Sequence, residues 1–273
     1  MSFVKNPGWV VRPNGPPAIP AMIRFLLRKT FLHWWDNLYT LLCVNLCLAL
    51  LVALYVYLAS LRGVGYLGIV IIYLFNLLIG TTSVAARKIS DYDPPDVRLF
   101  FLGAKTVWKD ALFFTACFVL HGIALNNIIP FYLTLGSKLA GLLLAMLLFW
   151  ACVTWWLAMI YYYPVRLRLN LPIFTTVRRA FLLFTDNPSL SFAIFLLSTA
   201  SLMLSFVTAM LLPGIGFMLV FHQVAGRTLL RRYRYLEGHP HAKQEIPWSL
   251  LLKDDLEFIG GRSAKGIVFP WKE

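Results

Sequence analysis

Charge is absent from five long stretches of this 273-residue sequence, and their lengths decide its class. No Asp, Glu, Lys or Arg occurs in 37–61, 63–86, 111–137, 139–165 or 187–226. Each of the first four exceeds the roughly 20 apolar residues that cross a ~30 Å hydrocarbon core. The mean hydropathy of +0.71 and the 59% of hydrophobic residues exclude an ordinary soluble domain. The sequence therefore predicts an all-α integral membrane protein.

Acidic residues are also scarce, so the net charge is +13. Such an excess can indicate nucleic-acid binding, but the distribution of the basic residues indicates a membrane instead. Of 25 Lys and Arg, 23 lie on one side of the predicted membrane, and only Arg62 and Lys138 lie on the other. Because cytoplasmic segments retain Lys and Arg, both termini are expected in the cytoplasm. The expected neighbours are the lipid bilayer and its anionic headgroups, with no nucleic acid.

The fifth uncharged stretch is too long for one span. A helix of its 40 residues would reach about 60 Å, and Leu212-Pro213-Gly214 near its middle breaks helices. With five spans the most basic segment would face outward, so we expect six. Residues 1–19 and 237–273 are then cytoplasmic segments around a membrane domain of 20–236. The six transmembrane helices, paired as three hairpins, are predicted at about 38–60, 64–86, 111–133, 139–163, 189–211 and 214–232.

A similar cytoplasmic stretch precedes each predicted hairpin. The three stretches begin at Pro20, Pro95 and Pro172, and each ends at an Asp, with Asp-to-Asp distances of 74 and 76 residues. This internal repeat predicts three amphipathic helices on the membrane surface. A carboxylate at the start of the next helix can cap its N–H groups, although the three could instead converge on a cytoplasmic site. The candidate caps are Asp36, Asp110 and Asp186.

Polar side chains are rare inside the predicted spans. The densest group is His121, Asn126 and Asn127, for which hydrogen bonding between helices is the simpler interpretation and a ligand site the alternative. Sequence motifs for nucleotide binding, serine hydrolysis and zinc proteolysis are missing. All four Cys lie within predicted spans, and Cys43 and Cys47, which share a helix face, have no accompanying His or carboxylate. We therefore expect no enzymatic activity, no metal and no cofactor.

The C-terminal tail is more apolar than a solvated chain end. Residues 248–259 have the pattern of a short helix, and an apolar segment, 267–271, lies close to the terminus. An exposed apolar segment is unfavourable in water. We expect the tail to fold back onto the cytoplasmic face or to bind a partner. The expected anchors are Phe269 and Trp271.

The sequence also carries a family pattern. A surface stretch from Pro172 to Pro188 contains Arg178-Arg179-Ala180-Phe181, and it follows a span that ends in Tyr161-Tyr162-Tyr163-Pro164. With the Leu212-Pro213-Gly214 break, this pattern resembles the YesL-like family of bacterial membrane proteins over about residues 20–235. The family has no agreed catalytic residues, and some members lie beside genes of sugar-uptake ABC transporters. The resemblance implies a bacterial inner membrane and an accessory role.

Two functions from different classes fit these features. The first is a non-enzymatic accessory or scaffold protein of the plasma membrane, linked to carbohydrate uptake, with an ABC transporter or another membrane protein as partner. The alternative is a small channel or carrier for a neutral solute or lipid. A closed bundle with a docked tail favours the first, and a continuous polar cavity favours the second.

Overall fold

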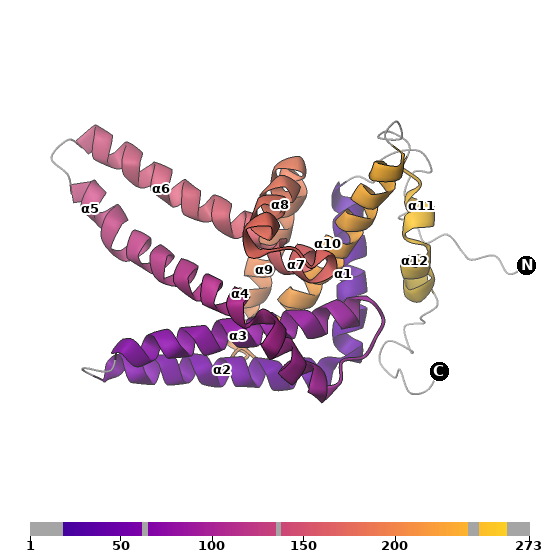
Figure 1. The fold of residues 1–273 in the computed structure, drawn as a ribbon, viewed down its shortest axis with the longest axis horizontal. Coiled ribbons are helices and arrows are strands. Elements are labelled where there is room, and N and C mark those ends of the chain that lie inside the picture. Colours follow the sequence, from indigo (N-terminus) through magenta and orange to yellow (C-terminus); the bar gives the residue numbers. More distant parts are fainter. Residues whose placement is uncertain (1–18, 62–64, 135–137, 240–245, 261–273) are drawn as a thin grey trace, which may run out of the picture. The chain divides into compact units, whose positions relative to one another are not determined.

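The computed structural model describes residues 19–61, 65–134, 138–239 and 246–260. These residues form helices and no strand, which confirms the predicted all-α class (Figure 1). The helices, with the π-helical turn η1, are α1 (Ile19–Asp36), α2 (Leu38–Ser60), α3 (Gly65–Ser90), α4 (Val97–Ile123), η1 (Ala124–Ile128), α5 (Ile129–Thr134), α6 (Lys138–Met159), α7 (Tyr162–Leu169), α8 (Ile173–Asp186), α9 (Pro188–Val207), α10 (Gly214–Gly238), α11 (Trp248–Leu251) and α12 (Lys253–Gly260).

The chain divides into two compact units. The first comprises Met1–Asn45, Ala86–Pro95 and Phe192–Glu273, and the second comprises Leu46–Ala85 and Asp96–Ser191. Helices α2, α3 and α9 each pass from one unit into the other.

Within the described residues, five helical stretches are long and apolar enough to cross a membrane, one fewer than predicted. These stretches are Leu38–Ser60, Leu67–Ser90, Arg98–Thr134, Leu139–Met159 and Pro188–Val207. They are compatible with a multi-pass membrane protein. The sixth predicted span, 214–232, falls in α10, where Arg227 ends the uncharged part. That part, 214–226, reaches only about 20 Å, less than the ~30 Å hydrocarbon core.

The second predicted surface helix does not exist as a separate element. Helix α4 begins at Val97 and continues without a break through Asp110 to Ile123. The expected boundary is missing because no proline or glycine lies near Asp110 to interrupt the helix. The other two predicted surface helices do exist as separate elements. They are α1 and α8, which end at Asp36 and Asp186.

Two other predicted spans end earlier than expected. Helix α6 ends at Met159 rather than 163, since Pro164 has no N–H to bond the carbonyl four residues before it. Helix α9 ends at Val207 rather than 211, and Ala209 and Met210 then take left-handed backbone conformations with φ of 51° and 65°. The predicted break between α9 and α10 is confirmed.

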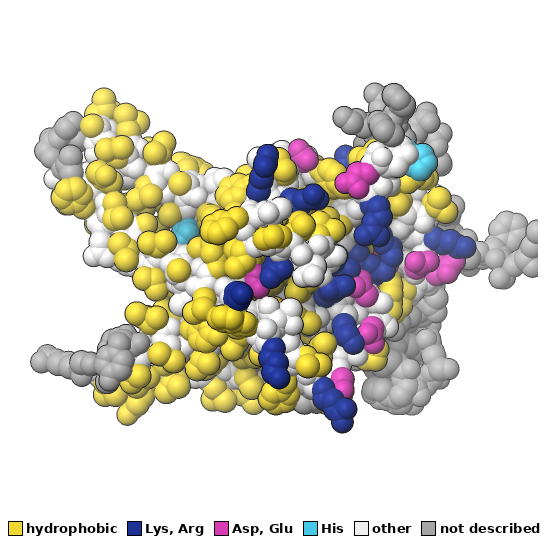
Figure 2. Space-filling model, in the orientation of Figure 1, with side chains coloured by type: hydrophobic (Ala, Val, Ile, Leu, Met, Phe, Trp, Pro, Cys, Tyr) yellow, Lys and Arg dark blue, Asp and Glu magenta, His cyan; other side chains and the backbone are white. Residues whose placement is uncertain are grey.

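Close helix contacts define the second unit. Helices α5 and α6 pack side by side (Figure 1). Gly80 of α3 faces Val107 of α4 and Tyr163 of α7, and a Cβ at Gly80 would lie 2.8 Å from Val107 Cγ2. The surface of α5 and α6 is apolar, and hydrophobic side chains cover its visible face (Figure 2). Large exposed residues there include Phe131, Leu139, Leu147, Phe149 and Trp150.

The first unit is built on the contact between α1 and α10. The α1 face that contributes Phe25, Leu32 and Trp34 is buried. The Trp34 ring meets Phe217 of α10 edge-on, with 5.9 Å between ring centroids. Such aromatic pairs add to the stability that the burial of apolar area provides.

Asn45 fixes the turn between α9 and α10. Its Nδ2 donates to the Leu211 carbonyl at 2.8 Å, and its Oδ1 accepts from the Gly216 N–H at 2.9 Å. A Cβ at Gly214 would lie 1.9 Å from Asn45 Nδ2, and Gly214 has a φ of +72°, so only glycine fits. Because Asn45 lies about two turns into α2, the turn lies at that level of α2.

Replacing Gly80 by Ala tests the close contact of α3, α4 and α7. We expect the G80A protein to lose about 1–3 kcal/mol of stability, because stiff, β-branched Val107 cannot move away from the new methyl group. Thermal unfolding in detergent measures the loss. The control is G122A, since nothing lies within 4 Å of a Cβ there. Equal stability of the two variants would contradict the close contact.

Candidate functional site

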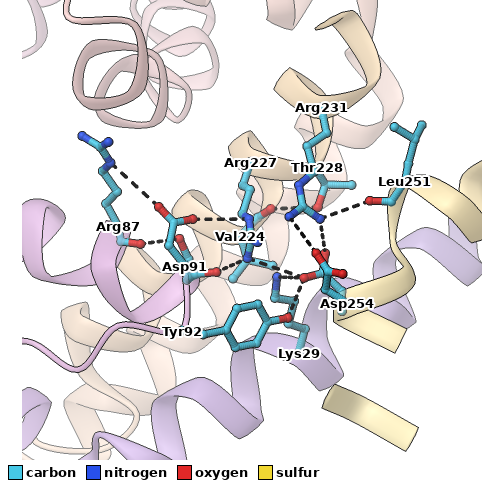
Figure 3. A network of polar contacts seen from close by, with 12 residues as sticks. Lys29, Arg87, Asp91, Tyr92, Val224, Arg227, Thr228, Arg231, Leu251 and Asp254 are labelled. Carbon is cyan, nitrogen blue, oxygen red and sulfur yellow. Dashed lines mark hydrogen bonds and ion pairs between the residues drawn. The ribbon is translucent and has the colours of Figure 1, made fainter. Parts of the chain in front are cut away.

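The C-terminal helix α12 docks on α1 and α10 around the carboxylate of Asp255. Helix α1 supplies Lys29, α10 supplies Arg227 and Arg231, and the turn after α3 supplies Tyr92 (Figure 3). The Lys29 side chain is 0% exposed and that of Asp255 is 1% exposed. We call these five residues the Asp255 cluster. It joins parts of the chain that are far apart in sequence.

Each oxygen of Asp255 has a donor. Lys29 Nζ lies 2.7 Å from Oδ1, and the Tyr92 hydroxyl donates to the same oxygen at 2.5 Å. Arg227 Nη1 also lies 3.5 Å from Oδ1. Arg231 Nη1 donates to Oδ2 at 3.1 Å and to the Leu251 carbonyl at 3.1 Å. Arg231 therefore holds both the side chain and the backbone of the tail.

Arg227 connects the cluster to the end of α3. Its Nε lies 3.3 Å from Asp91 Oδ1, and its Nη1 donates to the Ser90 carbonyl. Its guanidinium carbon lies 5.1 Å from the centroid of the Tyr92 ring, and Lys29 Nζ lies 5.0 Å from the same centroid. Cations over an aromatic face gain about 0.5–2 kcal/mol. Tyr92 therefore contributes both its hydroxyl and its ring.

Tyr92 holds this place in a backbone conformation that favours glycine. Its φ is 66°. The Asp93 N–H bonds to the Lys88 carbonyl and the Tyr92 N–H to the Ile89 carbonyl, which is the Schellman pattern at a helix end. A left-handed conformation costs a non-glycine residue roughly 1–2 kcal/mol. The contacts of the Tyr92 side chain offset this cost.

Apolar side chains enclose the ionic contacts. The rings of His33, Tyr92 and Phe258 lie 4.9 Å from one another in each pair. On the tail, Trp248, Leu252 and Ile259 are buried. The tail was expected to form one helix over 248–259, whereas α11 and α12 are separated at Leu252. The predicted anchors Phe269 and Trp271 lie outside the described residues.

Burial and charge shift the pKa values of Lys29 and Asp255. Burial lowers the pKa of Lys29 to about 7, with help from Arg227 and Arg231 and against the attraction of Asp255. Burial alone would raise the pKa of the Asp255 carboxyl, but the attraction of Lys29 and the other donors outweighs it and holds that pKa below its ordinary value. Asp255 therefore stays ionised at neutral pH.

His121, from the predicted polar cluster, faces a neighbouring helix. Its ring centroid lies 6.0 Å from that of Trp155 and 5.6 Å from that of Trp156, both on α6. Its Nδ1 lies 2.7 Å from the Cys117 carbonyl oxygen. These are contacts within α4 and between helices.

Asn126 and Asn127, the other two predicted members, are exposed in η1. Asn126 donates to the Gly122 carbonyl at 2.9 Å. The turn has a physical cause, since Pro130 has no N–H for the Asn126 carbonyl. The Ile129 N–H bonds instead five residues back, which widens the helix.

Asp36 and Asp186, two of the predicted caps, lie one residue before the cap positions of α2 and α9. Asn37 and Asn187 occupy those positions, and their carbonyls accept from the N–H groups of Leu41 and Ser191, four residues later. Their side chains also donate to carbonyls in the last turns of α1 and α8. Both Asp residues are exposed at these helix junctions.

Asp110 is not a cap, because it lies inside α4 and is 1% exposed. The Tyr162 hydroxyl and the Arg166 Nε, the latter at 2.9 Å, both donate to its Oδ1. Within the described residues, Asp110 Oδ2 and the Tyr163 hydroxyl have no hydrogen-bond partner. Asp110 joins α4 to α7, whereas Asp186 of the same unit is exposed, so these two carboxylates share no site.

The sequence contains a signal for the Asp255 cluster that hydrophobic run lengths do not reveal. Lys29 is in register with the buried apolar residues of α1, and Asp255 with those of the tail, at three- and four-residue spacing. The buried neighbours on these two faces are Phe25, Leu26, Leu32, Trp248, Leu252 and Ile259. A charge on an apolar helix face requires a buried partner.

No family model, no curated protein and no solved structure matches this sequence. The resemblance to the YesL-like family stays a prediction.

Replacing Asp255 by Asn should release the C-terminal helix. Removing one partner of a buried ionic group costs about 3–5 kcal/mol, so amide exchange over residues 248–260 should accelerate at least ~100-fold. Hydrogen exchange with mass spectrometry measures this. The matched control is D254N, because Asp254 is 73% exposed and 3.7 Å from Arg231. Unchanged exchange in D255N would show that apolar packing alone holds the tail.

The pKa of Lys29 predicts how stability depends on pH. Since the pKa of Lys29 in the folded protein is about 7 rather than 10.5, the unfolded chain binds more protons between these values. Stability from this group therefore rises with pH across that window. The wild-type protein should gain stability relative to K29M between pH 7 and pH 10, measured by thermal unfolding. If the stability of the wild type minus that of K29M falls over this pH range, the assignment is contradicted.

Proposed function

We propose that the protein is a non-enzymatic accessory or scaffold protein of a cell membrane, with both termini in the cytoplasm. The observation that supports this most is the docked tail, in which the Asp255 cluster fixes α12 on α1 and α10. In some proteins a buried ionic group specifies one arrangement of the chain rather than adding stability. A defined surface beside the membrane is what an interaction protein needs.

The exposed apolar helices support a lateral partner. Within the Arg98–Thr134 stretch, only 11% of the most apolar window is buried by the chain itself. Lipid or another membrane protein must cover the remainder, and helices associate in bilayers through close packing. The resemblance to the YesL-like family favours a bacterial inner membrane and an ABC transporter for carbohydrate uptake as the partner.

The topology that accompanies this function keeps both termini on one side. The distribution of Lys and Arg favours an even number of crossings, which six spans or four spans both satisfy. The turn between α9 and α10 is held by Asn45, about two turns into α2. We favour four full spans and a hairpin of α9 and α10 that enters and leaves from the cytoplasmic side.

A channel or carrier for a neutral solute or lipid is the second candidate. The observation in its favour is the buried polar group of α4 and α7, where Asp110 Oδ2 and the Tyr163 hydroxyl have no hydrogen-bond partner among the described residues. Buried polar groups within membrane proteins commonly mark transport paths. Solute flux into proteoliposomes of the purified protein would favour this candidate.

Cysteine accessibility tests the topology. In a protein whose four native cysteines are replaced, M210C should not react with a membrane-impermeant maleimide added outside, whereas S60C should react. The reason is that the turn at Met210 lies at the level of Asn45, on the cytoplasmic side. Reaction of M210C from outside would instead establish six spans.

Purification from native membranes tests the proposed function. A tagged protein should retain a transporter permease or its ATPase in mild detergent, identified by mass spectrometry. The control is a tagged, unrelated multi-pass protein expressed at the same level. Absence of any enriched membrane protein, together with solute flux in proteoliposomes, would replace the accessory role by the channel.

A further inference from the structure

We infer that the Asp255 carboxylate occupies a phosphate-binding site of α1, α10 and Tyr92, and that the headgroup of an anionic lipid competes with the C-terminal helix for this site. The observation behind it is the convergence of three cations on one carboxylate. Lys29, Arg227 and Arg231 all lie within 3.5 Å of Asp255 oxygens.

The donors suit a phosphate group. An ammonium, two guanidinium groups and a phenol surround the two oxygens of Asp255. Arg binds phosphate oxygens through its planar set of N–H groups, and Lys does so as a point charge. A lipid phosphodiester has two non-bridging oxygens, as many as a carboxylate, and carries the same charge. It can therefore accept from the same donors once Asp255 has left.

The charge balance makes the site dependent on an anion. If α12 leaves, it removes both Asp254 and Asp255, and Asp91 is the remaining carboxylate that contacts these cations in the described residues. Lys29 is 0% exposed and Arg227 only 10% while α12 is docked. When α12 leaves, three like charges remain close together, and like charges repel one another unless an anion or solvent screens them. An anionic ligand therefore lowers the free energy of the undocked state.

The position of Lys29 favours a lipid as the source of phosphate. Lys29 lies about two and a half turns before α2, the first apolar stretch, and the half-buried Trp35 lies between them. A tethered tail competes at an effective concentration in the millimolar range. Headgroups at a membrane surface are concentrated enough to compete, whereas a dilute soluble phosphate is not. The inference deepens the proposed function and rests on it for the membrane location.

Hydrogen exchange in lipid nanodiscs tests the competition. Residues 248–260 are followed in phosphatidylcholine discs and in discs with half phosphatidylglycerol, at constant ionic strength. Phosphatidylglycerol should accelerate exchange of these residues about tenfold, a shift that ~1.4 kcal/mol produces. The R231Q variant should lose this lipid response. R234Q, which removes an exposed cation from the same helix, should keep it.

A second measurement does not depend on the folding of R231Q. The D255N protein, with its tail released, should retain more phosphatidylglycerol through purification than the wild type, as counted by lipid mass spectrometry. K29Q added to D255N should remove the extra lipid. This result does not require any partner protein, so it stands or fails separately from the purification of a transporter.

The remaining arms identify the ligand or reject the site. Glycerol phosphate that accelerates exchange when phosphatidylglycerol does not would keep the phosphate site and assign it to a soluble ligand. The inference would be overturned if neither phosphatidylglycerol nor glycerol phosphate accelerates exchange of residues 248–260. It would also be overturned if sodium chloride accelerates exchange to the same extent. Equal lipid retention by D255N and the wild type would also overturn it.

Discussion

The docking of α12 on the first unit depends on one requirement, that the buried carboxylate of Asp255 have partners. A charge without water is stable only when donors replace its hydration. Lys29, Arg231 and Tyr92 meet this requirement from three separate elements. Since each of these groups is itself fixed by neighbouring helices, the position of α12 follows from theirs. The same requirement explains why Tyr92 keeps its left-handed backbone at the end of α3.

The sequence was most informative where a local property decides the structure. The length of an uncharged run sets the length of a helix, and α2 matches the predicted 38–60 for this reason. Leu212-Pro213-Gly214 broke the helix as predicted, because proline and glycine act on their own turns. Asp110 was placed wrongly because the end of a helix without a breaker depends on tertiary contacts. Its partners Tyr162 and Arg166 lie more than fifty residues away.

The candidate site could not be predicted from run lengths for the same reason. Lys29 and Asp255 are 226 residues apart, so no local pattern reveals the pair. Membrane orientation depends on how many basic residues lie on each side, and this number does not distinguish the buried Lys29 from a surface charge. Only the register of each residue within an apolar helix face indicates burial. That register shows a charge that needs a partner but does not identify the partner.

The two buried carboxylates show what a surplus of cations adds. Asp110 accepts from Tyr162 and from one cation, Arg166, so its charge is balanced and the contact joins α4 to α7. Asp255 has the same combination of phenol and guanidinium, but Lys29 and a second Arg also contact it. One carboxylate with one cation, as at Asp110, is enough to attach one helix to another. The additional cations keep the site attractive to an anion after Asp255 leaves, which makes this contact exchangeable where the Asp110 contact is not.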